Sequence, residues 1–315
     1  MKRVMDVLWP VIGLSAVVFS SWLLFKELKH LSLDEVGATL LALSPLDWGF
    51  AIAASFCAYT ALAWYDRIAL AFLGRKLPWR FVALVSFTTY ALAHNIGASV
   101  FSGAVVRYRA YSTKGLSAPE VGLLVAFCSL TFVLGTLLLG GVVLMIEPEL
   151  IHRVADVPIN GGRAVALLLL AGPWAYGVGS LLHLRPLKIG IFELIYPRPP
   201  IAVRQFLAAP LELIGAASII YFALPAASNP GFLVVLGAFL ASFSLALISH
   251  APGGLGVLEL SFLNILPDAP QAEVVAALLV FRLLYLIVPL IFALVVVVMF
   301  EKDRIGGLLK RKPRA

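Results

Sequence analysis

Eight apolar runs dominate this sequence, and they constrain its fold more than any other feature. A helix needs about 20 predominantly apolar residues to cross a bilayer, and most of the runs reach that length. Between them, the less apolar stretches extend to only about twenty residues, so no separate soluble domain is expected. The runs lie at 4–25, 46–72, 79–95, 117–146, 163–183, 201–224, 231–250 and 271–300.

Composition excludes a soluble fold for these runs. Hydrophobic residues make up 61% of the chain, charged residues 13%, and the mean hydropathy is +0.99, whereas soluble domains are about one quarter charged. In lipid, only helices or closed barrels satisfy the backbone, and the long unalternated runs exclude a barrel. The sequence predicts an all-α polytopic membrane protein with about eight long helices, in one membrane domain over residues 1–315.

The two ends of the chain support this topology. Residues Lys2-Arg3 precede an apolar stretch that is too long for a signal peptide and has no small-residue cleavage site before Lys26, so we expect a retained first span. Residues 32–44 open with a serine and an acidic turn, which indicates a short interfacial helix. The basic segment 301–315 indicates a cytoplasmic tail.

Two segments, 94–109 and 250–259, interrupt the helical pattern. Both are too apolar for ordinary loops, yet they are rich in Gly, Ser or Pro. Non-helical backbone at membrane depth is tolerated only where protein or a water-filled cavity surrounds it. Each segment is therefore predicted to be a broken or re-entrant helix.

The interruptions divide the chain into two similar halves, approximately 1–160 and 161–300. Residues 91–94 loosely match 246–250 at an offset of 156 residues, and Ala118–Phe127 resembles Ala272–Phe281 at an offset close to 153. Helices rich in Ala and Leu resemble one another easily, so this likeness alone leaves an internal repeat open.

Charge placement favours the repeat. The net charge is +7, and the basic residues lie at the chain ends and in loops, which the positive-inside rule explains without nucleic acid. Eight plain spans would put the acidic loop 147–162 inside and the basic loop 184–204 outside. If each interruption instead returns the chain to its side of origin, every loop conforms and both termini are cytoplasmic. This predicts an inverted repeat with opposed hairpins at 79–109 and 231–266, an arrangement that transporters place around a midplane site.

The most distinctive motif is Pro252-Gly253-Gly254-Leu255-Gly256. It lacks the GK[ST] of a P-loop and the preceding strand of a Rossmann turn. Glycines let the backbone approach a ligand or a helix closely, and amides freed at the start of the next helix favour an anion. We predict that Gly253, Gly254 and Gly256 bind substrate; a tight structural turn is the alternative.

Three residues after this motif are predicted to line the substrate path. Glu259 is a carboxylate in apolar surroundings, which is costly unless it is paired or wetted, and Arg282 in the last run is its natural partner. Tyr285 follows in the same run and is included with them. The alternative is that one or both charges snorkel to an interface.

A cationic and aromatic group, Arg107-Tyr108-Arg109, lies at the exit of the first interruption. Arginine is suited to bidentate phosphate contact, so these residues are predicted to bind the phosphate of a lipid. Anchoring of the chain at the cytoplasmic interface is the alternative.

Five further polar residues are candidates for the path or for ion pairing. Asp66 is also interpreted as half of an interfacial pair with Arg67, and Glu212 follows Pro210, either near the midplane or beside a kink that admits water. The histidines are either proton-sensitive or satisfied by broken-helix backbone. The five candidates are Asp66, His94, Asn95, Glu212 and His250.

Signatures of catalysis are absent from the sequence. It contains no HExxH or GxSxG motif and no His/Cys/Asp cluster at metal-ligand spacing, and Cys57 and Cys128 lie far apart within apolar runs. We therefore expect no enzyme activity, no metal and no cofactor.

The two interrupted segments resemble the signatures of one membrane family. Pro252–Glu259 followed by Arg282, and Gly103–Ser112 followed by Gly115-Leu116-Ser117, are similar to those of the lysylphosphatidylglycerol synthase transmembrane region, also called the UPF0104 family. The resemblance covers essentially the whole chain. In multi-domain members this region adjoins a cytosolic synthase domain that aminoacylates phosphatidylglycerol, and it is thought to move the product between leaflets. A chain ending at Ala315 is expected to carry the membrane part only.

Together these observations predict a lipid translocator, or flippase, of the bacterial inner membrane that acts on phospholipids with an anionic phosphate. The alternative is an accessory subunit or membrane-embedded enzyme of lipid modification or glycolipid synthesis. The expected protein partner is a second copy of the chain or a separate lipid-modifying enzyme.

Overall fold

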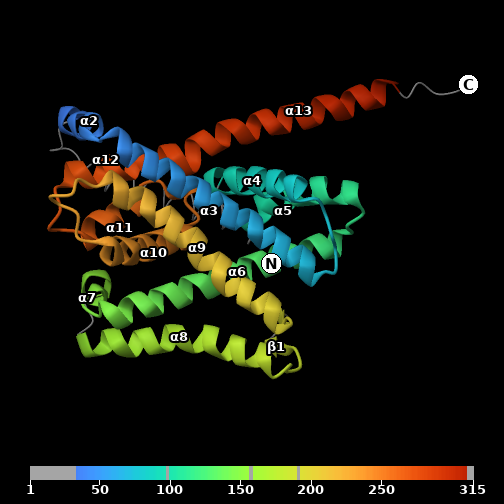
Figure 1. Ribbon diagram of the computed structural model, residues 1–315, viewed down its shortest axis with the longest axis horizontal. Helices are drawn as coiled ribbons and strands as arrows, with labels where there is room; N and C mark the ends of the chain where they lie inside the picture. Colours follow the sequence, from blue (N-terminus) through green and yellow to red (C-terminus); the bar gives the residue numbers. More distant parts are fainter. Residues whose placement is uncertain (1–32, 97–98, 156–158, 190–191, 311–315) are drawn as a thin grey trace, which may run out of the picture.

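A computed structural model describes residues 33–96, 99–155, 159–189 and 192–310, and it is a bundle of helices with one small β-hairpin (Figure 1). The first half contains α2 (Leu33–Ala42), α3 (Pro45–Phe72), α4 (Trp79–Ile96), α5 (Ser99–Tyr111), a 3-10 turn (Ser112–Lys114), α6 (Ala118–Ile146) and α7 (Leu150–Ala155). The second contains α8 (Ile159–Leu181), β1 (Leu187–Ile189), β2 (Phe192–Leu194), α9 (Pro199–Ala223), α10 (Phe232–Ser249), a 3-10 turn (Pro252–Gly254), α11 (Val257–Ile265), α12 (Gln271–Phe281), a π-helical segment (Arg282–Ile287) and α13 (Val288–Lys310).

Six helical stretches in the described part of the chain are long and apolar enough to cross a membrane. The predicted first span, 4–25, lies outside the described residues. The run at 79–95 forms α4, which is helical as predicted but is not among the six. The six stretches are Pro45–Phe72, Ala118–Ile146, Gly161–Leu181, Pro199–Ala223, Phe232–Ser249 and Gln271–Met299.

Local sequence signals explain where the long helices of the first half begin. Ser44 precedes Pro45, and its side chain accepts from the amide of Asp47 while the Asp47 carboxylate accepts from the amide of Ser44. The same capping box recurs before α6, where Glu120 accepts from the amide of Ser117 at 2.8 Å. A Ser followed three residues later by an acid, with Pro in the first turn, favours a helix start.

The element order repeats along the chain with a constant spacing. A long helix, a helix, a break, a short helix and a second long helix follow one another in both halves. The helices at 45, 79 and 118 have counterparts that begin at 199, 232 and 271, an offset of 153 to 154 residues. This spacing agrees with the offset of 153 expected from the sequence.

The two halves have opposite directions. Equivalent helices α3 and α9 pack against each other antiparallel: the rings of Phe50 and Phe222 stack at 5.0 Å near one end, and Tyr65 contacts Glu212 toward the other. Gly215 permits the close crossing, because a Cβ there would lie 2.9 Å from the Ala58 amide nitrogen. Small residues allow such close approach between membrane helices. This antiparallel packing and the repeated element order agree with the predicted inverted repeat.

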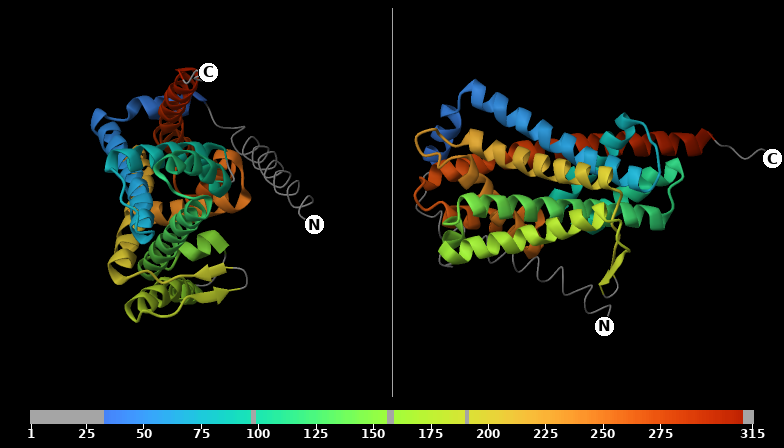
Figure 2. Two further views of the ribbon diagram at one scale, coloured as in Figure 1. Left: turned by 90° about the vertical axis from the view of Figure 1, so that its right-hand side faces the viewer. Right: turned by 60° about the horizontal axis from the view of Figure 1, so that its bottom comes forward.

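The interruptions form two helical hairpins that meet tip to tip. The first is α4–α5, and the second is α10–α11, joined by residues 250–256, here called the glycine loop. The end of α4 contacts the glycine loop, and the hairpins extend from opposite ends of the bundle in Figures 1 and 2. The prediction of two opposed hairpins holds.

The hairpin arrangement gathers the basic loops at one end of the bundle, here called the basic end. The Arg75–Glu120 ion pair joins the α3–α4 link to the start of α6, and the β-hairpin lies at the same end in Figure 1. The α6–α7 and α11–α12 links meet at the opposite end, where Arg153 pairs with Asp268 at 3.1 Å. Beyond residue 300, predicted as a tail, α13 remains helical to Lys310 and extends past the bundle at the basic end.

Candidate functional site

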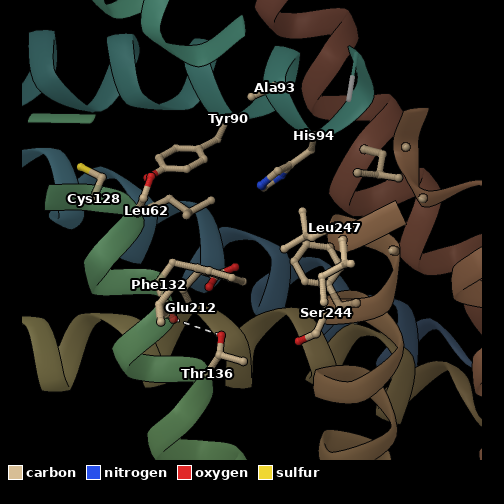
Figure 3. A pocket seen from close by; sticks show the side chains of 18 of the residues that line it. Leu62, Tyr90, Ala93, His94, Cys128, Phe132, Thr136, Glu212, Ser244 and Leu247 are labelled. Atoms are coloured by element: carbon tan, nitrogen blue, oxygen red, sulfur yellow. Dashed lines mark hydrogen bonds between the residues drawn. The ribbon is translucent and has the colours of Figure 1, made fainter. Parts of the chain in front are cut away.

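A cavity of about 550 Å³ lies between the two hairpin tips. Polar side chains, among them His94, Glu212 and Ser244, face it beside aromatic and aliphatic ones (Figure 3). Val133 and Ile248 also line the cavity, and they are 47% and 71% exposed on the outside of the bundle. Both lie on helices that can cross a membrane, so we expect this side of the cavity to face lipid.

Asp66 is the centre of a buried cluster on α3. Its carboxylate accepts hydrogen bonds from Arg107 at 2.6 and 3.2 Å and from the Tyr111 hydroxyl at 2.7 Å. The Arg107 guanidinium also lies 4.8 Å from the centroid of the Tyr90 ring. Asp66 is fully buried and Arg107 is 4% exposed, so this bidentate pair ties α5 to α3 away from water.

This cluster changes two predictions from the sequence. Asp66 does not pair with Arg67, which donates to the Leu77 carbonyl at 2.7 Å. Arg107 faces inward, whereas Tyr108 and Arg109 are exposed, because successive helical residues point about 100° apart. A phosphate that reached Arg107 would have to compete with the Asp66 carboxylate, so at the surface of the basic end Arg109 is the better placed of the two arginines.

Glu259 and Arg282 form a second ion pair, as predicted, and it ties α11 to the π segment. The Arg282 guanidinium donates to Glu259 and to the carbonyl of Gly253 at 2.9 Å. The other Glu259 oxygen accepts from the Gly256 amide at 2.8 Å. Both side chains are about one tenth exposed, so they do not snorkel to an interface. The amide predicted to attract an anion is bound by the protein's own carboxylate.

The glycines of the loop are required by its backbone. Gly253, Gly254 and Gly256 have φ values of +61°, +63° and +77°, a region that costs other residues about 1–2 kcal/mol each. A Cβ on Gly254 would also approach that of Ala246 to 2.9 Å. The tight structural turn, which was the alternative given from the sequence, is present. Substrate binding by these glycines stays a prediction.

The π segment explains the position of Tyr285. Pro289 has no amide hydrogen to donate to the Tyr285 carbonyl one turn earlier, and a π turn widens the helix at this point. The backbone carbonyls released are bonded by side chains from α3 and α4. Ser55 donates to Leu284, Tyr59 to Tyr285 and Asn95 to Leu286, at 2.8, 2.9 and 3.1 Å.

Glu212 lies on α9, two residues after Pro210, and contacts α3 and the π segment. It is 1% exposed, and it accepts hydrogen bonds from Tyr285 at 2.6 Å and from Tyr65 at 3.4 Å. It lines the cavity, so the sequence alternative of a site near the midplane agrees with its position between the hairpin tips.

His94 and His250 both line the cavity but differ in their contacts. His94 is stacked on Tyr285 with ring centroids 5.3 Å apart, and its buried Nδ1 has no hydrogen-bond partner among the described residues. The His250 ring contacts the Ile248 carbonyl, and its backbone is left-handed at φ +55°. Backbone therefore satisfies His250, as the sequence alternative stated, but not His94.

Sequence reasoning missed the tyrosines and the cysteine of these clusters. Tyr65, Tyr90, Tyr111 and Cys128 all contact a buried charge or the cavity. A sequence signal exists in hindsight, since tyrosine hydroxyls inside apolar runs need partners. It does not say which partner each hydroxyl meets.

Comparison with known proteins gives three relatives, while no family model matches the chain. The uncharacterized protein slr0712 of Synechocystis is 30% identical over 294 residues, 92% of this chain and 90% of that protein. The inner membrane protein YbhN of Escherichia coli is 30% identical over 252 residues, 78% of this chain and 77% of YbhN. The phosphatidylglycerol lysyltransferase of Staphylococcus haemolyticus is 28% identical over 86% of this chain, which is 31% of that enzyme.

Proposed function

The chain belongs to the membrane-protein family that includes YbhN and slr0712. We propose that it moves phospholipids between the leaflets of the bacterial inner membrane. The match to part of a phosphatidylglycerol lysyltransferase supports a role in lipid handling, in agreement with the motif resemblance. The proposal contains no chemical step.

The observation that carries the proposal is the cavity between the hairpin tips. A lipid that changes leaflet needs a polar space for its head group at mid-depth and an open side for its acyl chains. The cavity has polar groups at His94 and Glu212 and an apolar rim at Val133 and Ile248. Transporters with opposed broken helices also place their binding sites at such a junction.

The charged groups divide into two roles in this proposal. Arg109 and Lys114, at the exit of the first hairpin, attract the lipid phosphate at the basic end. The Glu259–Arg282 pair, which holds the glycine loop, lets that loop move when a head group competes for either partner. Gly253 and Gly254 themselves line the cavity.

Orientation follows from the loop charges. The basic end carries Arg75, Lys76, Arg185 and Arg198, and the positive-inside rule assigns such an end to the cytoplasm. The first hairpin then enters from the cytoplasm, the second enters from outside, and the C-terminus is cytoplasmic. Single cysteines at Glu149 and Arg185, in a variant without native cysteines, test this in intact cells. Labelling of position 185 from outside would contradict the orientation.

Lipid movement itself is tested in proteoliposomes that contain head-group-labelled phosphatidylglycerol or phosphatidylethanolamine. A membrane-impermeant quencher reports how fast inner-leaflet lipid reaches the outer leaflet. Vesicles that contain the purified chain should show a higher rate than protein-free vesicles. Glu259→Gln and Arg282→Ala should change that rate. Exchange equal to protein-free vesicles would instead favour the accessory-subunit role.

A matched pair of variants tests the cavity. Ser244 lines it, whereas the neighbouring Leu245 does not and is exposed on the outside of α10. Ser244→Trp should fill the space and abolish lipid movement, while Leu245→Trp should leave it unchanged. Equal rates for the two variants would show that lipid does not pass through this cavity.

A further inference from the structure

Three carboxylates are buried within the described part of the bundle, and they differ in their partners. Asp66 has Arg107, and Glu259 has Arg282. Glu212 has the hydroxyls of Tyr285 and Tyr65, which are neutral donors. A charge buried without a counter-ion is costly, and the usual escape is to take up a proton.

Among the described residues of the elements that pack on α9, no Lys or Arg contacts Glu212. The arginine that shares the cavity, Arg107, is bound by Asp66. Helix α10 contains no titratable residue, and Glu273 of α12 is at the far end, where it contacts Ser228. On α8, Tyr176 is bonded to Gln205. The titratable groups around Glu212 and the cavity are Tyr59, Tyr65, Tyr90, His94, Cys128, His250 and Tyr285.

The cavity offers a route for water to this carboxylate. Besides His94 Nδ1, the buried hydroxyl of Thr89 has no partner among the described residues, and both residues line the same 550 Å³ space as Glu212. Water occupies about 30 Å³ per molecule and enters cavities that offer polar partners. Figure 3 shows His94 and Glu212 facing this space from different walls.

Glu212 is also connected to the glycine loop by a short path. Tyr285, which donates to Glu212, lies one turn after Arg282 on the π segment. Arg282 in turn holds the glycine loop through Glu259 and the Gly253 carbonyl. A change in the charge of Glu212 alters the Tyr285 hydrogen bond and therefore the position of the segment that holds the loop.

We propose that Glu212, with Tyr65 and Tyr285, is a proton-binding site that couples lipid movement to the proton gradient. The proton comes from cavity water and returns to it. The coupling rests on the proposed translocation, whereas proton binding at Glu212 does not.

Proton binding is tested on the purified full-length chain by infrared difference spectroscopy between acidic and alkaline buffer. We expect the carbonyl-stretch band of a protonated carboxylic acid to disappear in Glu212→Gln and to persist, shifted, in Glu212→Asp. The control Glu147→Gln, at the end of α6 outside the cavity, should keep the wild-type band. A band unchanged in Glu212→Gln would overturn the site.

Coupling is tested in proteoliposomes with labelled phosphatidylglycerol under a pH gradient or a sodium gradient. We expect the pH gradient to change the wild-type rate several-fold, and Glu212→Gln to move lipid at a rate that no longer responds. A response to sodium alone, or an equal pH response in Glu212→Gln, would overturn the coupling. If no lipid moves but the infrared band is lost in Glu212→Gln, translocation fails and the proton site stands.

Discussion

In the first hairpin, the second helix, α5, carries Arg107. Its ion-pair partner Asp66 lies on the neighbouring long helix α3. In the second hairpin, the second helix, α11, carries Glu259. Its ion-pair partner Arg282 lies on the π segment that follows α12. The first pair has side-chain exposures of 5% and 0%, the second of 11% and 9%. The second pair also binds loop carbonyls and a loop amide.

This difference indicates different jobs for equivalent hairpins. An ion pair buried this deeply is costly to separate, so we expect the first hairpin to be a fixed wall of the cavity. The second pair is slightly more exposed and holds a loop built of glycines, so we expect its contacts to separate more easily. Stability measurements on variants of both hairpins test this difference.

The largest effect is expected for Arg107→Ala. Removing the guanidinium leaves the buried Asp66 carboxylate without its counter-ion. We expect the free energy of unfolding, measured with denaturant in detergent, to fall by about 3–5 kcal/mol. The control is Arg109→Ala, on the exposed side of the same helix, with an effect within about 0.5 kcal/mol. Similar losses for both would show that the first pair is no anchor.

Arg282→Ala should cost less, about 2 kcal/mol, because Glu259 keeps its Gly256 amide and some solvent. Its effect should be local: amide exchange should rise in the glycine loop and stay low in α5. Hydrogen–deuterium exchange with mass spectrometry measures both segments in one experiment. A uniform rise in amide exchange across the two hairpins would show that they do not differ in this way.

Gly254→Ala is expected to cost about 1–2 kcal/mol, because the backbone there is left-handed and the new methyl group meets Ala246. The matched control is Gly122→Ala in α6, where a Cβ has open space. Alanine in that helix should stabilise by about 0.5–1 kcal/mol. Thermal unfolding of both variants shows whether each substitution stabilises or destabilises the protein. If Gly254→Ala were stabilising, the left-handed backbone described for the loop would be contradicted.

Tyr59→Phe should have the smallest effect, about 1 kcal/mol, from loss of one buried hydrogen bond to the Tyr285 carbonyl. Tyr221→Phe is the comparison, since the described contacts of that ring are with Phe222 and Phe232. The unfolding midpoint should fall for Tyr59→Phe and stay unchanged for Tyr221→Phe. Equal midpoints would mean that α3 does not anchor the π segment.

Much of the fold was predictable because it depends on local patterns. The lengths of the apolar runs located the long helices. The charges of the loops predicted that each interruption is a hairpin, without knowledge of any contact. The Glu259–Arg282 pair was also predictable, since both charges lie in apolar surroundings and one pairing satisfies them.

The remaining site residues could not be placed because their partners are set by packing between distant helices. Asp66 has an arginine next to it in sequence, yet the helical turn directs that neighbour elsewhere, and the partner is 41 residues away. The π segment depends on Pro289 together with hydroxyl donors from another helix. No single segment contains that information.

The open side of the cavity has a consequence for selectivity. A pocket closed on all sides measures its whole ligand, whereas one bounded by Val133 and Ile248 at an exposed edge leaves the acyl chains of a lipid in the bilayer. Chain length and unsaturation then contribute nothing to recognition. The proposed translocator is therefore expected to select lipids by head group and to tolerate different fatty acids.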